Sequence, residues 1–162
     1  ASSLAEHYDT VWVPEFARDY LQEKFDRTQI ICEYEDLLPI AQGQMILENK
    51  LAAEANRVLV CDTDLLETQV YSAQYYEGRI DPLLSKYARL NSYDLYFLTD
   101  IDVPWEPDDL RDRPHQREEM FKAFEQALVD YERNYVLLSG DLERRMETAI
   151  KHIDQLLNSR LG

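Results

Sequence analysis

The sequence is poor in several residue types, and each shortage excludes a class of protein. Only two cysteines, Cys32 and Cys61, occur among the 162 residues, too few for a disulfide framework. No apolar run approaches the ~20 residues that a membrane-spanning helix needs, and no signal peptide opens the chain. We therefore expect a cytoplasmic protein without membrane contact, in which Cys61 is a buried, reduced thiol.

Basic residues and histidines are also scarce. The 17 Lys and Arg residues are outnumbered by 32 Asp and Glu residues, and the net charge is −15. Nucleic acids are disfavoured as partners, because binding them requires cations that neutralise phosphates. The three histidines, His7, His115 and His152, are dispersed, so neither a zinc site nor a Ser-His-Asp triad has support. An anionic small molecule stays possible where arginines gather or a metal ion intervenes.

Glycine occurs four times, and no Gly-Lys-Ser/Thr triplet is present. The chain as printed therefore lacks a glycine-rich loop of the kind that cradles phosphates. Short apolar runs, by contrast, alternate regularly with helical patterns in a chain of single-domain length. This alternation predicts an α/β fold, 1–162, with a parallel sheet covered by helices on both faces. The expected strands are 10–13, 58–61, 95–98 and 135–138, and the expected helices are 16–25, 37–56, 65–76, 82–89, 115–133 and 142–161, with 26–36 as a polar loop.

The strand 58–61 is the most informative segment, because it ends in two carboxylates, Asp62 and Asp64. The carboxyl ends of parallel strands face the crevice where α/β proteins bind ligands. An acid there can hold Mg²⁺ beside a nucleotide. Alternatively, either acid caps the helix that begins at Leu65. Residue types leave both interpretations open for Asp62 and favour capping for Asp64.

Three arginines within seven residues form a local positive spot: Arg111 and Arg113 lie in the proline-rich segment 103–114, and Arg117 follows it. Guanidinium groups are permanently charged forks that suit phosphate oxygens. Taken alone, the segment favours a surface ion-pair network with its neighbouring acids. Trp105, in the same segment, is a candidate either for stacking on a substrate or for the core.

Two other strand ends carry candidate residues. Glu15 follows the strand 10–13, where a base could accept a hydroxyl proton, and Arg18 lies one helical turn on. A carboxylate that interacts with the helix dipole is the simpler interpretation of Glu15. Gly140 and Asp141 follow the last strand, where a glycine lets the backbone approach a flat ring, although a tight turn explains it equally well. For Asp100 and Asp102, after the strand 95–98, we favour a solvated loop role.

Five segments in this order resemble the kinase domain of NadR-type ribosylnicotinamide kinases, which have the P-loop fold. They are VPEFARDYL, EDLLPIAQGQ, VLVCDTDLLET, YDLYFLTDIDVPWEPDDLR and YVLLSGDLERR. The resemblance extends from about residue 10 to 153. It implies that a strand and a glycine-rich Walker A loop, about 15–20 residues long, precede this chain and lie centrally between the strands 58–61 and 95–98.

The resemblance also implies roles for the candidate residues. Asp62 would be the carboxylate that serves Mg²⁺, and Glu15 the acid that engages the substrate hydroxyl. A lid, 103–117, would close on the phosphates of ATP, with Arg111 and Arg117 acting in the transfer and Arg113 binding the nucleotide. Gly140 and Asp141 would border the adenine, and Arg18, Asp64 and Trp105 would contact the substrate.

The implied activity is ATP-dependent phosphorylation of nicotinamide riboside to nicotinamide mononucleotide in NAD salvage, carried out by the intact protein with ATP and Mg²⁺. A further domain fused upstream is compatible with this prediction. Two alternatives stay open: a non-catalytic module that binds a nucleotide or pyridine nucleoside, and a kinase for another nucleoside or small metabolite.

Overall fold

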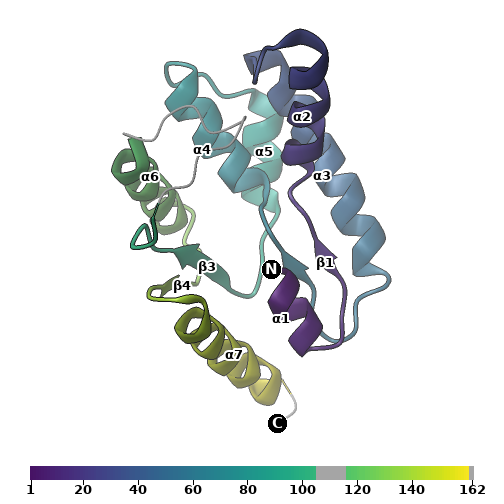
Figure 1. The fold of residues 1–162 in the computed structure, drawn as a ribbon, viewed down its shortest axis with the longest axis vertical. Helices are drawn as coiled ribbons and strands as arrows, with labels where there is room; N and C mark the ends of the chain where they lie inside the picture. The colour runs from purple at the N-terminus through teal and green to yellow at the C-terminus, as the bar shows by residue number, and fades with distance from the viewer. Residues whose placement is uncertain (105–115, 161–162) are drawn as a thin grey trace. The chain divides into compact units, whose positions relative to one another are not determined.

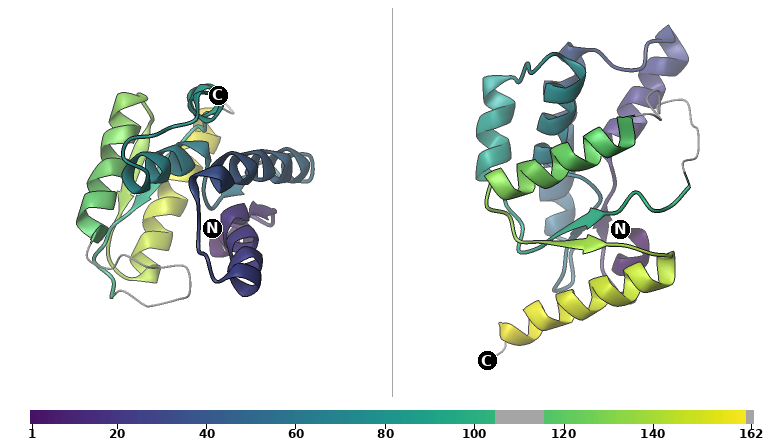
Figure 2. Two further views of the ribbon diagram at one scale, coloured as in Figure 1. Left: turned by 90° about the horizontal axis from the view of Figure 1, so that it is seen from above. Right: turned by 90° about the vertical axis from the view of Figure 1, so that its left-hand side faces the viewer.

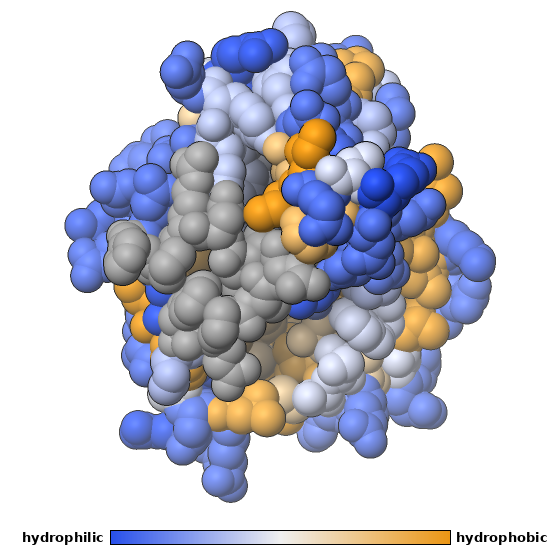
Figure 3. Space-filling model, turned by 45° about the horizontal axis from the view of Figure 1, so that its top comes forward, coloured by the Kyte–Doolittle hydropathy of each residue, from blue (hydrophilic) through white to orange (hydrophobic). Residues whose placement is uncertain are grey.

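The computed structural model describes residues 1–104 and 116–160 (Figure 1). The chain forms two compact units, and among the described residues these are 1–92 and 93–104 with 116–160. Each unit contains one pair of parallel strands. None of the described helices is long and apolar enough to span a bilayer. Hydrophilic side chains predominate on the face drawn in Figure 3, as the net charge of −15 leads one to expect.

The first unit is mostly helical and contains two very short strands. Its elements are α1 (Ser2–His7), β1 (Trp12–Val13), α2 (Phe16–Thr28), the 3₁₀ helix η1 (Tyr34–Asp36), α3 (Leu37–Ala52), β2 (Val60–Cys61), α4 (Leu65–Tyr75) and α5 (Pro82–Leu90). Helices α3, α4 and α5 pack around four buried side chains, with partly buried Leu38 and Met45 against them. The four are Ala41, Leu65, Leu84 and Ala88.

Strands β1 and β2 pair in parallel, with Trp12 opposite Val60 and Val13 opposite Cys61. The ladder continues one residue further, because the backbone N–H of Asp62 donates to the carbonyl of Val13 at 2.8 Å. Val13 is fully buried, whereas Cys61 is only partly buried. The expectation of a buried Cys61 is therefore wrong, whereas the residue is a free cysteine as expected.

Helix α2 is longer than the sequence predicts. It continues to Thr28 and ends where Gln29 adopts a left-handed conformation, with φ of 60°. Residues 26–28, which the sequence predicts as part of a polar loop, thus form the exposed last turn of this helix. Lys24 anchors α2 to the start of α3, since its Nζ lies 2.5 Å from Oδ2 of Asp36 and both side chains are largely buried. Tyr20 adds a hydrogen bond of 3.1 Å to the same carboxylate.

The second unit contains β3 (Tyr96–Thr99), α6 (Arg117–Asp130), β4 (Tyr135–Leu138) and α7 (Leu142–Ser159). Strands β3 and β4 pair in parallel over four residues, from Tyr96–Tyr135 to Thr99–Leu138. Helices α6 and α7 lie on opposite faces of this pair (Figures 1 and 2). Ala149 and Ile153 form the buried part of α7. Leu142, which the helical spacing assigns to the same face, is 69% exposed because it is the first residue of the helix.

The predicted α/β class with parallel strands and covering helices is confirmed. All four predicted strands are present within two residues of their expected bounds. In the described residues they form two separate two-stranded sheets, β1 with β2 and β3 with β4.

Candidate functional site

The end of β1 carries Glu15 and Arg18. Glu15 is the N-cap residue of α2, with extended backbone angles (φ −68°, ψ 105°), and its side chain does not cap the helix. The backbone N–H of Arg18 donates to the Glu15 carbonyl at 3.2 Å, which starts the first turn. Arg18 itself is exposed. The turn into the helix therefore carries a carboxylate side chain and, three residues later, a positively charged guanidinium.

Asp62 lies at the neighbouring strand end and is exposed. Its backbone bond to Val13 places it beside the residues that lead into Glu15. The structure thus brings Glu15 and Asp62 to the same edge of the β1–β2 pair, as the parallel pairing predicts.

Asp64 has a different environment, because its side chain caps α4. Its Oδ1 accepts a hydrogen bond of 2.9 Å from the backbone N–H of Glu67. The expectation that Asp64 is the capping residue is confirmed. The cap also fixes the direction in which the chain leaves the strand end after Asp62.

Glu67 was missed by the sequence analysis. Desolvation of its carboxyl group raises its pKa to about 8, and the negative charges of Glu15, Asp64 and Asp62 add to the rise, against a hydrogen bond with Thr63 that lowers it. Four carboxyl groups therefore share one small region of the first unit. No local pattern identifies Glu67, because its environment arises only when β1, β2 and α4 come together.

This donor set fits a divalent cation that is shared with a nucleotide. Magnesium prefers oxygen ligands and commonly uses one or two protein carboxylates, with water and phosphates completing its shell. Among residues 1–104 and 116–160, no cluster of three or more His, Cys, Asp or Glu side chains has the geometry to hold a metal by itself. The exposed carboxylate of Asp62, near the negative charges of Glu15 and Asp64, could supply one oxygen ligand to such an ion.

Gln44, one of the two glutamines of α3, was also missed. The side chain of Gln44, which is 2% exposed, accepts a hydrogen bond from the backbone N–H of Phe16 at 2.8 Å. Its amide nitrogen donates to the carbonyl of Pro14 at 3.3 Å. Gln44 therefore contacts the backbone on both sides of Glu15.

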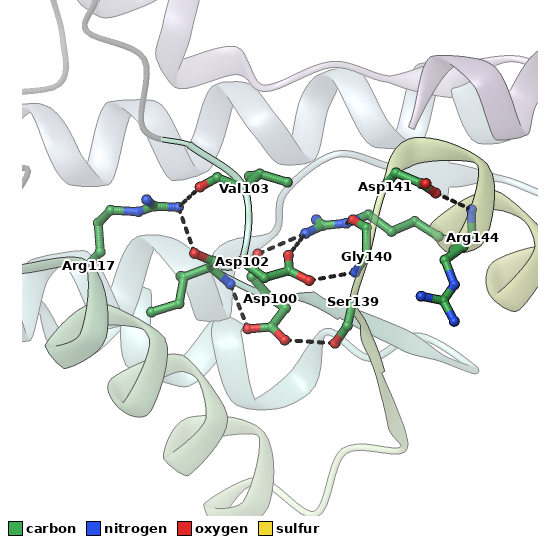
Figure 4. Close-up of polar contacts among 10 residues, drawn as sticks. Asp100, Asp102, Val103, Arg117, Ser139, Gly140, Asp141 and Arg144 are labelled. Carbon is green, nitrogen blue, oxygen red and sulfur yellow. Dashed lines mark hydrogen bonds and ion pairs between the residues drawn. The ribbon is translucent and has the colours of Figure 1, made fainter.

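In the second unit, the ends of β3 and β4 are held together by polar contacts (Figure 4). The hydroxyl of Ser139 donates to Asp100 at 2.7 Å, and the backbone N–H of Gly140 donates to Asp102 at 2.5 Å. Arg145 pairs with Asp102 and donates to the carbonyls of Gly140 at 2.8 Å and of Asp100 at 3.1 Å. Asp100 and Asp102 lie in the loop after β3, as expected, and their carboxylates also bond to the turn after β4.

These contacts define the turn that follows β4. Gly140 has φ of 90°, a conformation that a side chain would strain. Asp141 caps α7, with Oδ1 accepting from the backbone N–H of Arg144 at 3.0 Å. The turn thus has a fixed backbone and no side chain at Gly140. The hydrogen bonds from Gly140 and Arg145 lower the pKa of Asp102, so it is charged at neutral pH.

Arg117 lies at the start of α6, and its guanidinium donates to the carbonyls of Ile101 at 3.2 Å and Val103 at 2.9 Å. It ties the residues after β3 to the helix that follows. Arg111, Arg113 and Trp105 lie outside the described residues, and so does most of the expected lid 103–117.

Parallel strands whose carboxyl ends carry acids, with helices over the strands, are typical of the α/β class of domain that binds ligands at those strand ends. Comparison with known proteins agrees. A family model described as an AAA domain matches residues 1–145, and the chain therefore belongs to this P-loop family.

Two curated relatives are similar to most of the chain, and both are named "Trifunctional NAD biosynthesis/regulator protein NadR". The Salmonella typhimurium protein is 30% identical over 129 residues, which are 80% of this chain and 31% of that protein. The Escherichia coli protein is 31% identical over 110 residues, which are 68% of this chain and 27% of that protein. The resemblance inferred from the sequence motifs is thereby confirmed. The chain spans about a third of the length of these relatives.

Proposed function

We propose that this domain, in the full-length natural protein, transfers the γ-phosphoryl group of ATP to the 5′-hydroxyl of nicotinamide riboside and forms nicotinamide mononucleotide. The observation that carries the proposal is the placement of Glu15 and Asp62 at adjacent strand ends by the bond between Asp62 and Val13. The similarity to NadR proteins, whose printed name includes NAD biosynthesis, supports the choice of substrate.

In the proposed reaction, the hydroxyl oxygen of the riboside forms a bond to the γ-phosphorus while the bond from that phosphorus to the bridging oxygen of ADP breaks. Glu15 accepts the hydroxyl proton or orients the hydroxyl for attack. Asp62 would hold Mg²⁺, which neutralises phosphate charge as it develops. Arg18, exposed on the first turn of α2, would contact the substrate, and so would Asp64.

The turn at Gly140 and Asp141 would border the adenine, because a fixed backbone without a side chain can approach a flat ring. Arg111 and Arg113, with Trp105, would belong to a phosphate-binding lid. For Arg117 to act in the transfer, its guanidinium would exchange the carbonyls of Ile101 and Val103 for phosphate oxygens.

Turnover by the full-length protein, measured with ATP, Mg²⁺ and a panel of nucleosides, tests this proposal. We expect nicotinamide riboside to give the highest kcat/KM. General base catalysis contributes on the order of 10²-fold or more, so Glu15→Gln should lower kcat at least that much. Glu23→Gln, which removes an exposed acid from the same helix, is the matched control. A clear preference for another nucleoside would contradict the substrate assignment while leaving a kinase.

A further inference from the structure

The acid proposed to engage the substrate sits in a backbone turn that is held from outside by α3. The N–H of Phe16 and the carbonyl of Pro14, the groups on either side of Glu15, both bond to the side chain of Gln44. Gln44 is 28 residues beyond Phe16 in the chain and is almost completely buried. A long-range contact therefore determines the backbone of the turn.

A carboxamide suits both bonds, because it has an acceptor oxygen and a donor nitrogen on one plane. The opposite orientation of the amide would set its NH₂ against the N–H of Phe16 and its oxygen against the carbonyl of Pro14. Both contacts would be repulsive, so the two partners fix the orientation of Gln44. A carboxylate at this position would keep the acceptor and lose the donor.

The preceding residue allows α3 to come this close. A β-carbon at Gly43 would overlap the ring of Phe16, with Cε1, Cζ and Cδ1 as its nearest atoms. Gly43 has helical geometry, so its purpose is space for the ring rather than conformational freedom. Gly43 leaves space for the ring of Phe16 and Gln44 binds its backbone N–H, so the first residue of α2 packs against α3.

The first N–H group of α2 finds its partner outside the helix. The first N–H groups of a helix lack partners within the helix, and the N-cap side chain commonly accepts from one of them. Here the external oxygen of Gln44 satisfies Phe16, and the Glu15 side chain makes no capping bond. Glutamate is not a favoured capping residue, so the backbone of this turn depends on Gln44 rather than on a cap from Glu15.

We infer that Gln44 is a positioning residue that holds Glu15 at the end of β1 by clamping Pro14 and Phe16. The inference rests on the proposed function, because it gives Glu15 the role of engaging the phosphoryl acceptor. It adds that α3, which contributes no group to the chemistry, sets the geometry of that acid. Small displacements of a reacting group can cost about 10²-fold in rate.

The test compares Gln44→Leu and Gln44→Glu, alone and combined with Glu15→Ala, in the full-length protein. We expect either Gln44 change to lower kcat/KM for the nucleoside about 10- to 100-fold, with KM for ATP within about twofold. In the Glu15→Ala background the same changes should have no further effect on turnover. Ser72→Ala is the control, because it removes a buried hydrogen bond to the Arg79 carbonyl in the same unit.

Hydrogen exchange at the Phe16 amide gives a readout independent of activity. We expect Gln44→Leu to accelerate it at least about tenfold, since the acceptor is lost, and Ser72→Ala to leave it unchanged. Two results would overturn the inference. One is unchanged hydrogen exchange at the Phe16 amide in Gln44→Leu, and the other is an equal further loss of turnover from the Gln44 changes in the wild-type and the Glu15→Ala backgrounds. Full turnover in Glu15→Ala alone would instead overturn the assignment of Glu15, and it is recognised without any change at Gln44.

Discussion

The backbone N–H of Asp62 donates to the carbonyl of Val13 across 2.8 Å, one residue beyond the last strand pair. This bond fixes where each chain leaves the β1–β2 sheet. Glu15 lies two residues after Val13 and Asp62 is itself the donor, so both acids emerge at one edge. The side-chain chemistry proposed for this edge therefore depends on a backbone contact.

Replacing Asp62 by asparagine should weaken the use of Mg²⁺. Asparagine has nearly the same shape but lacks the charge, so the concentration of Mg²⁺ needed for half-maximal turnover should rise about tenfold or more. The measurement is turnover against Mg²⁺ concentration at saturating ATP. Glu54→Gln removes an equally exposed acid elsewhere in the unit and should leave the curve unchanged. An unaltered Mg²⁺ requirement in Asp62→Asn would exclude this residue as the metal-binding acid.

Replacing Asp64 by alanine should lower the free energy of unfolding by about 1 kcal/mol, because the N-cap bond to Glu67 is lost. Asp64→Asn preserves an acceptor oxygen and should retain most of the stability. Urea denaturation of both variants gives the comparison. Equal losses in the two variants would mean that the charge of Asp64, rather than its cap, stabilises α4.

The sequence could predict these strand ends because the necessary signals are local. A short β-branched run followed by acids indicates a parallel strand, and an acid immediately before a helical pattern indicates a cap. The extent of α2 could not be predicted in the same way. Its last turn is polar and exposed, and the contacts of Lys24 and Tyr20 with Asp36 that anchor the helix join residues 12 and 16 positions apart.

Glu67 should make stability depend on pH in a particular direction. Its pKa is raised from 4.5 to about 8, so between these values the folded protein binds a proton that the unfolded chain has released. The contribution of Glu67 to the free energy of unfolding is fully present below pH 4.5 and is lost as the pH rises through about 8. Glu67→Gln should remove the loss and raise the free energy of unfolding near pH 9 by on the order of 1–3 kcal/mol.

Denaturation of the wild type and Glu67→Gln across this pH range measures the difference. Glu77→Gln, at an exposed position beyond the end of α4, controls for the loss of one negative charge. A difference between wild type and Glu67→Gln that does not change with pH would show that the carboxyl group of Glu67 titrates normally in the folded state.

Arg145 should hold the turn after β4 in the shape that binds the nucleotide. Arg145→Gln removes the ion pair with Asp102 and should raise KM for ATP about tenfold while changing kcat little. The neighbouring Arg144→Gln is a matched control, since Arg144 is exposed. Equal KM values for ATP in the two variants would show that the Arg145 contacts do not affect nucleotide binding.

The roles of Gln44, Glu67 and Arg145 could not be predicted from the sequence, and the reason is the same for each. In the sequence, each of them looks like an ordinary surface residue. Gln44 is a glutamine inside a helix, Glu67 is an acid in a first helical turn, and Arg145 is an arginine beside another arginine. Their significance comes from partners far away in the chain: Pro14 and Phe16 for Gln44, Glu15 for Glu67, and Asp102 for Arg145.

The most direct test of the central claim follows the phosphoryl group itself. The full-length protein is incubated with γ-phosphate-labelled ATP, Mg²⁺ and nicotinamide riboside, and the labelled products are separated. The account predicts label in nicotinamide mononucleotide, dependent on Mg²⁺ and lowered by at least about 10²-fold in Glu15→Gln. Label found only in inorganic phosphate, or undiminished transfer in Glu15→Gln, would contradict it.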